Sequence, residues 1–180
     1  MPSPIVHLTA GYAIYRLSKH NLPERERQLL KIPIALLIIA GLSILPDLDF
    51  MVGLLLGDIE KYHNNISHSL LVGLPVALLA ASLMVLWSRS SRFWVWFAVS
   101  LAAYDLHPIL DLFAGERGVM LFWPIVQDRF TSPVKLFYGV QWGLGLISPW
   151  HFVTILSELL FLIIVYFLIA WLDKRKPARL

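Results

Sequence analysis

The chain contains no cysteine and few charged side chains, and both absences limit what it can be. Without cysteine, disulfide bonds and thiolate metal sites are excluded. Charged residues make up only 15% of the 180 residues and hydrophobic residues 58%, whereas a soluble domain carries about 25% charged residues. The net charge of +3 does not indicate nucleic-acid binding, because the basic residues gather beside apolar segments, and we expect no nucleic-acid partner. The composition therefore indicates a membrane protein.

Long apolar runs predict the membrane helices. Residues 68–87 and 152–172 are nearly free of charge and have the length of about 20 residues that spans the hydrocarbon core. Further helices are predicted at 32–46, at 93–113 and at 4–17, the last of which is short for a full span. Residues 114–151 mix glycine, proline and aromatic residues, which is typical of a loop or a re-entrant region. We predict an all-α fold in one membrane-embedded domain, residues 1–180: a polytopic helical bundle with four to five membrane-embedded helices.

The basic residues predict the orientation of these helices. Lysine and arginine cluster within 16–31, 89–92 and 174–179, and such clusters favour the cytoplasmic side. Five helices with an outside N-terminus place all three clusters there. The same topology brings five of the six histidines to the opposite end, with His20 as the exception. If the first helix instead lies on the membrane surface, His7 falls on the wrong side and is no ligand.

Histidine and carboxylate side chains together are ligands for zinc, manganese or iron. His107 and Asp111 are four residues apart, so a helix places both on one face, one turn apart. Asp47 and Asp49 follow Pro46, which we expect to end the preceding helix and leave an irregular turn. His63 and His68 do not share a helical face, so we expect a loop and a first helical turn, capped by Ser67 or Asn65. These residues predict a metal site near one membrane face.

Plainer interpretations compete with this one. Polar residues at these positions could simply terminate helices, and His151 is typical of an interfacial residue. Glu158 lies inside an apolar helix and requires a partner there, and His151 shares its face. Asp105 points away from the face of His107 and Asp111, so it could support the ligands without touching the ion.

The ordered set His7, LPDLD (45–49), HNNISHS (63–69), HPILD (107–111) and GVMLFWP (118–124) resembles the YdjM family of membrane-bound predicted metal-dependent hydrolases. That family shows an N-terminal histidine, LPD-x-D, H-R-x-x-T-H-S, H-x-x-x-D and a Gly-to-Pro stretch, and the resemblance covers about residues 3–125. The pattern is similar, more distantly, to zinc-dependent phospholipase C and the related single-strand nucleases. Asn64 replaces the family arginine and Ser67 its threonine, so Arg117 or Arg129 could supply the missing cation.

The resemblance implies a membrane-bound metal-dependent hydrolase of a phosphoester, possibly a lipid. It implies a divalent ion, zinc first and manganese or iron as alternatives, with these ligands: His7, Asp47, His63, His68, His107 and Asp111. Asp47 or Asp49 would be the catalytic base that activates water, and spacing does not choose between them. We expect membrane lipids as surroundings, a small-molecule or lipid phosphoester as substrate, and a bacterial inner membrane location with the site on the extracytoplasmic side. The alternative is a non-catalytic metal-binding protein or a structural or regulatory membrane protein.

Overall fold

The computed structural model describes residues 2–31, 33–115, 117–140, 144 and 148–175, and the side chains of His20, Asn21 and Glu60 lie outside the description. The described part of the chain is helical, without a strand. Its elements are α1 (Pro4–Asn21), α2 (Glu24–Leu30), α3 (Pro33–Ile44), the 3₁₀ turn η1 (Leu45–Leu48), α4 (Asp49–Leu56), α5 (Ile59–Tyr62), the 3₁₀ turn η2 (Ile66–His68), α6 (Leu70–Ser88), α7 (Phe93–Asp111) and α8 (Pro149–Arg175).

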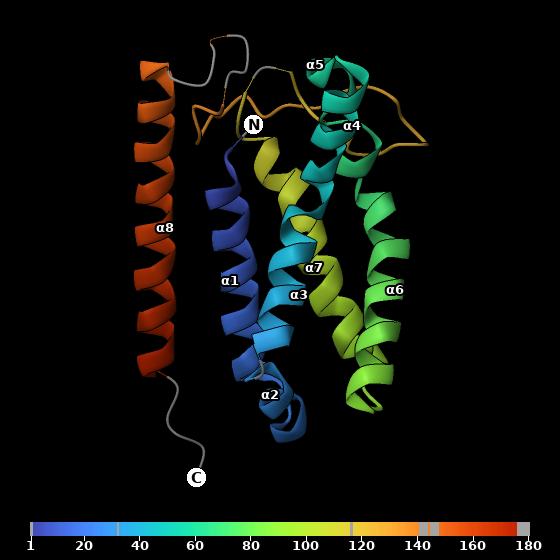
Figure 1. The fold of residues 1–180 in the computed structure, drawn as a ribbon. Helices are drawn as coiled ribbons and strands as arrows, with labels where there is room; N and C mark the ends of the chain where they lie inside the picture. Colours follow the sequence, from blue (N-terminus) through green and yellow to red (C-terminus); the bar gives the residue numbers. More distant parts are fainter. Residues whose placement is uncertain (1, 32, 116, 141–143, 145–147, 176–180) are drawn as a thin grey trace.

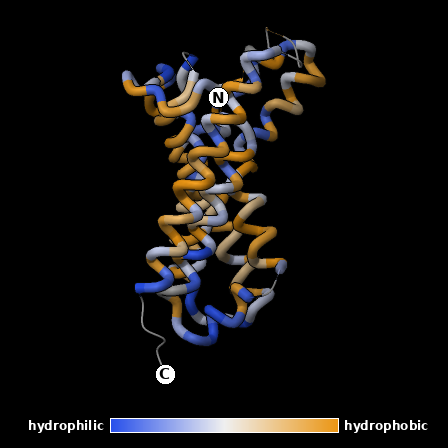
Figure 2. The backbone as a smooth tube through the Cα atoms, turned by 90° about the vertical axis from the view of Figure 1, so that its left-hand side faces the viewer, coloured by the Kyte–Doolittle hydropathy of each residue, from blue (hydrophilic) through white to orange (hydrophobic). Residues whose placement is uncertain are grey.

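Four helical stretches are long and apolar enough to cross a membrane: Pro33–Leu56, Leu70–Ser88, Phe93–Asp111 and Pro149–Arg175. The prediction of a polytopic helical bundle is thus confirmed. In Figure 1 the long helices stand side by side, with α8 at one edge beside α1 and α6 at the other. Figure 2 shows hydrophobic positions along the middle of the bundle and hydrophilic ones at the end that carries α2.

The first helix lies within the bundle. It extends to Asn21, beyond the predicted segment 4–17, and packs against α3, α7 and α8. A Cβ atom at Gly11 would lie 2.5 Å from Ser43 Oγ, so glycine lets α1 approach α3 closely at this level. His7 lies one turn before Gly11, on the same face, and is therefore held toward the interior.

Two local predictions were wrong. Pro46 does not end the second helix in an open turn, because α3, η1 and α4 run on as one stretch with a single 3₁₀ turn at Leu45–Leu48. Neither Ser67 nor Asn65 caps α6, because Ser69 does so, accepting from the backbone N–H of Leu71 at 3.2 Å. A 3₁₀ turn accommodates a proline at its start, where no intrahelical N–H is needed.

The basic clusters gather at one end of the bundle. Arg25 in α2 donates to the backbone carbonyl of Arg89 at 3.0 Å, which joins the first cluster to the turn between α6 and α7. Arg16 pairs with Asp173 near the end of α8, where the third cluster begins. Residues 176–179 of that cluster lie outside the described residues. The predicted separation of basic residues from the histidine end is therefore present.

Candidate metal centre

The opposite end of the bundle carries two groups of three side chains that could hold an ion. His7, His107 and Asp111 form one group, and all three are buried. Asp47, His63 and His68 form the other. Within each group, one ligand atom per residue lies within 4.8 Å of the others. These are the six ligands predicted from the sequence, brought together from α1, η1, the α5–η2 segment and α7.

The two groups touch each other through carboxylates and imidazoles. Asp111 Oδ2 lies 3.4 Å from His107 Nε2 and 3.2 Å from His68 Nε2. Asp47 Oδ1 lies 3.4 Å from His107 Nε2 and 3.7 Å from the Nε2 atoms of His63 and His68. His7 stacks on His107 with ring centroids 3.6 Å apart. The six residues therefore form one continuous cluster.

Several atoms of this cluster lack hydrogen bonds. Within the described part of the chain, both ring nitrogens of His7 and all four carboxylate oxygens of Asp47 and Asp111 are buried without a hydrogen-bond partner. His7 Nε2 and Asp111 Oδ1, at 3.4 Å, are close enough to attract each other but lack hydrogen-bond geometry. Buried carboxylates without partners are costly, since an uncompensated charge in the interior is strongly destabilising. Convergent lone pairs of this kind fit a divalent cation.

Hydrogen bonds on the far side of two rings turn their Nε2 atoms toward the cluster. His107 Nδ1 lies 2.7 Å from the backbone carbonyl oxygen of Ser43, which can only accept. His107 therefore carries a proton on Nδ1, and its Nε2 atom is directed at Asp47 and Asp111. His63 Nδ1 lies 2.5 Å from Asp49 Oδ1, so the Nε2 of His63 is directed at Asp47.

Asp49 lies behind the histidines rather than among the grouped ligands. Its Oδ2 accepts from Ser67 Oγ at 2.7 Å and lies 3.2 Å from His68 Nδ1, while its Oδ1 meets His63. A carboxylate on the second nitrogen of a metal-binding histidine fixes the ring and raises its basicity. The arrangement thus gives Asp49 contacts that Asp47 does not make.

Electrostatics at His68 favour a charged ring while no ion is present. Burial lowers the pKa of His68, but the nearby carboxylates of Asp111, Asp47 and Asp49 outweigh burial and raise that pKa well above its usual range. The ring is fully buried, so its charge is balanced by these carboxylates alone. A cation entering the cluster would replace the positive charge of the His68 ring beside these carboxylates.

The loop after α7 folds over the cluster beside HNNISHS. Val119 and Phe130 exchange two backbone hydrogen bonds of 2.9 Å, which close residues 119–130 into a compact turn. Ser69 Oγ donates to the carbonyl of Trp123 at 2.6 Å, so the GVMLFWP stretch is attached to the start of α6.

Arg129 reaches the HNNISHS stretch from that loop. It donates to the backbone carbonyls of Asn64 and Gly118, each at 3.2 Å, and to the side chain of Asn65. Asn64 has a positive φ of 61°, a conformation that asparagine tolerates better than most residues. Burial and the neighbouring Arg117 lower the pKa of Arg129. Of the two cations predicted to replace the family arginine, Arg129 contacts Asn64 itself, whereas Arg117 is exposed.

Three other predicted residues lie elsewhere. Asp105 packs against α6, where a Cβ atom at Gly73 would lie 1.9 Å from its Oδ1. Glu158 is fully buried, and its carboxylate accepts from the backbone N–H of Ser3 at 2.7 Å and from Ser3 Oγ. Its partner is thus Ser3 at the start of α1. Neither Glu158 nor His151 belongs to the two ligand groups found among the described residues.

Sequence reasoning did not anticipate the carbonyl of Ser43, the Ser3–Glu158 contact or Tyr104. The Tyr104 hydroxyl donates to the carbonyl of Ser67 at 2.6 Å and so ties α7 to the HNNISHS stretch. A backbone carbonyl has no sequence signature, and the polar serine at position 3 of an otherwise apolar start was the only available signal for Glu158's partner.

Comparison with known proteins identifies the family of the chain. Residues 1–177 match the family described as YdjM inner membrane protein. The inner membrane protein YbcI of Escherichia coli (strain K12) is 31% identical over 170 residues, which covers 89% of this chain and 90% of that protein. No solved structure matches the chain. The family and the four apolar helices support a bacterial inner membrane location. The chain belongs to the YdjM family of inner membrane proteins.

Proposed function

We propose that the chain is a membrane-bound, metal-dependent hydrolase of phosphoesters, with its site on the extracytoplasmic side. The observation that supports this most is the buried cluster in which three carboxylate oxygens of Asp47 and Asp111, without hydrogen-bond partners among the described residues, face the Nε2 atoms of four histidines. Such a donor set suits zinc, and manganese or iron are alternatives. The basic clusters at the far end of the bundle support the extracytoplasmic placement.

The chain's own residues would hold the ion and position it. His7, His107 and Asp111 would bind from the α1–α7 side, and Asp47, His63 and His68 from the η1–η2 side. A divalent metal supplies Lewis acidity, which lowers the pKa of a water ligand toward ~7 and offsets charge on phosphoryl oxygens. The Ser43 carbonyl and Asp49 hold three of the rings in orientation.

Asp47 is the better candidate for the catalytic base. Its two oxygens make no hydrogen bond, whereas both oxygens of Asp49 are engaged by His63, Ser67 and His68. In the proposed reaction a water oxygen forms a bond to phosphorus, its proton passes to Asp47 Oδ2, and the ester P–O bond breaks. The leaving oxygen takes up that proton from Asp47 and departs as an alcohol, which restores the carboxylate. Asp49 is then a positioning residue.

Metal analysis and turnover of the same preparations test this function. Detergent-purified protein is stripped, reloaded with zinc or manganese, and assayed with bis(p-nitrophenyl) phosphate beside His107→Ala and Asp111→Ala. Asp128→Asn is the matched control, because Asp128 is an exposed carboxylate outside both ligand groups. We expect bound metal and turnover in the wild type and the control, and neither in the two variants. Metal without turnover of any phosphoester would favour the non-catalytic alternative, and absence of metal after reloading would overturn both.

A further inference from the structure

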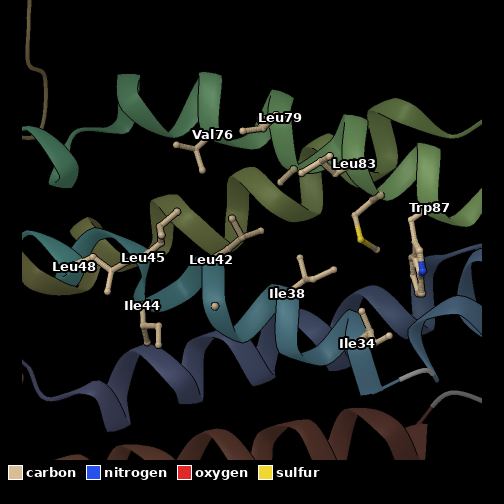
Figure 3. A pocket seen from close by; sticks show the side chains of 13 residues that line it. Ile34, Ile38, Leu42, Ile44, Leu45, Leu48, Val76, Leu79, Leu83 and Trp87 are labelled. Atoms are coloured by element: carbon tan, nitrogen blue, oxygen red, sulfur yellow. The ribbon is translucent and has the colours of Figure 1, made fainter.

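An apolar groove begins beside the candidate metal centre and runs along the bundle. Its volume is about 720 Å³, and it lies between α3 with η1 on one side and α6 on the other. Figure 3 shows Leu48 and Leu45 at one end and Ile34 and Trp87 at the other. All its lining side chains are apolar, and it lies between two of the helices that can cross a membrane.

The groove ends at the turn that carries Asp47. Leu45 and Leu48 line it, and both belong to η1 together with Asp47. The cluster also comes nearest to the surface here, since the side chains of Asp47 and Asp49 are 15% and 12% exposed while those of His68, His107 and Asp111 are fully buried. The apolar groove and the accessible edge of the polar cluster therefore meet at η1.

The groove is long enough for an acyl chain. It extends about 16 Å along α6, from Val76 to Trp87, and about 21 Å along α3 and η1, from Ile34 to Leu48, at 1.5 Å per residue. It is therefore longer than half of the ~30 Å hydrocarbon core. A helix from a partner protein is rigid and about 10 Å wide, whereas this groove has an apolar lining and lies between two helices that can cross a membrane, where lipid surrounds the protein. A narrow, flexible hydrocarbon chain is the better fit.

The metal-ligand cluster at one end of the groove gives the lipid a direction. Arg129 lies at the HNNISHS stretch on this side, and the cluster has the donor set for a cation. Basic side chains also gather beyond the far end, which Trp87 and Ile34 line, so the direction follows from the ligand cluster and not from charge alone. We propose that the groove holds the acyl chain of a phospholipid whose phosphate lies at the metal centre. The inference rests on the proposed function and names its substrate class: phospholipids of the leaflet that contains the cluster.

A larger side chain at Gly41 would fill the groove. It lines the groove on α3, and a Cβ atom added there meets nothing within 4 Å, so Gly41→Phe is compatible with the fold. Gly41→Ala adds a single methyl group and serves as the mild variant. Leu37→Trp is the matched control, since Leu37 is on the same helix, is 69% exposed and is not a lining residue.

Two measurements distinguish binding of the acyl chain in the groove from hydrolysis at the metal centre. The first is photolabelling in phosphatidylcholine vesicles with a phospholipid that bears a diazirine in the middle of its acyl chain, followed by peptide mapping. The second is hydrolysis of a 16-carbon-chain phospholipid compared with bis(p-nitrophenyl) phosphate. We expect labelling of the α3 and α6 groove peptides that Gly41→Phe removes, with long-chain hydrolysis reduced about tenfold and hydrolysis of the soluble ester unchanged. Leu37→Trp and Gly41→Ala should match the wild type in both.

Other outcomes are equally informative. Labelling spread evenly over α8 and the groove, and unaltered by Gly41→Phe, would show annular lipid only and overturn the inference. Equal loss of long-chain and soluble turnover in Gly41→Phe would overturn it too, because the effect would not depend on the acyl chain. Groove labelling that Gly41→Phe removes, in a wild type that hydrolyses neither ester, would uphold lipid binding and overturn the hydrolase proposal.

Discussion

Asp49 and His63 meet at 2.5 Å, carboxylate Oδ1 to imidazole Nδ1, while the opposite nitrogen of the same ring faces Asp47 Oδ1 at 3.7 Å. One imidazole thus lies between two carboxylates with different surroundings. Asp49 is engaged by three side chains, whereas the oxygens of Asp47 have no hydrogen bond in the described chain. The two aspartates should therefore differ in what their loss does.

Asp47→Asn is expected to abolish metal retention and turnover, because it removes a ligand charge from the centre of the cluster. Asp49→Asn should bind metal about 10–100-fold more weakly, as loss of a carboxylate behind a histidine ligand usually does, and excess metal should restore turnover. Zinc titration and activity at saturating zinc measure both. Equal behaviour of the two variants would contradict the separate roles.

Arg129→Ala should raise KM for an anionic ester about tenfold, because a charge-assisted hydrogen bond contributes roughly 1.5–3 kcal/mol, and it should leave metal content unchanged. Arg129→Lys should recover part of the loss, since the charge remains. Arg117→Ala is the comparison, because Arg117 is exposed, whereas Arg129 is the arginine that donates to the Asn64 carbonyl. A fall in kcat with unchanged KM would instead assign Arg129 to loop structure alone.

Glu158→Ala should destabilise the protein by about 1–3 kcal/mol, because it leaves the partly buried Ser3 N–H without this acceptor. Glu158→Gln keeps one acceptor and should cost less. Thermal unfolding in detergent measures the difference, with Ser157→Ala as control, since Ser157 Oγ donates to the carbonyl of Thr154 in its own helix. An unchanged midpoint in Glu158→Ala would show that α8 does not hold α1 through this contact.

Metal loading should weaken as the pH falls. The pKa of His68 is raised in the metal-free cluster, so the ring is protonated at neutral pH and an entering ion must displace that proton. The apparent zinc Kd should therefore rise about tenfold per unit of acidification below that raised pKa, and it should level off above it. Competition with a chelator of known proton affinity from pH 6 to pH 8 measures the slope. A flat Kd would mean that His68 is neutral before the ion arrives.

The grouping of the six candidate side chains was predictable because histidine and aspartate are informative where apolar helices surround them. The spacing of His107 and Asp111 correctly predicted two side chains on one face, 3.4 Å apart at their nearest atoms. The bundle was predictable from hydrophobic length alone, since apolar stretches such as 68–87 and 152–172 have few alternatives to membrane helices.

The unpredicted parts depend on tertiary contacts or on backbone atoms. Pro46 predicts the end of a helix, yet the 3₁₀ turn that contains it leads directly into α4. The carbonyl that orients His107 belongs to Ser43, 64 residues away. Every residue has a backbone carbonyl, so the residue type does not indicate which one will accept a hydrogen bond. Glu158 required a partner, but the partner is Ser3, 155 residues away, rather than a neighbour on its own helix.

The six candidate ligands come from four segments between residues 7 and 111, so an ion among them would close several long chain loops at once. Loop closure by a metal couples ion binding to folding free energy, and the folded population then depends on the free-ion concentration. A chain inserted during metal starvation would leave the buried carboxylates of Asp47 and Asp111 facing each other without a cation. Supply of the ion would thus decide how long each molecule survives quality control in the membrane, apart from whether it turns over substrate.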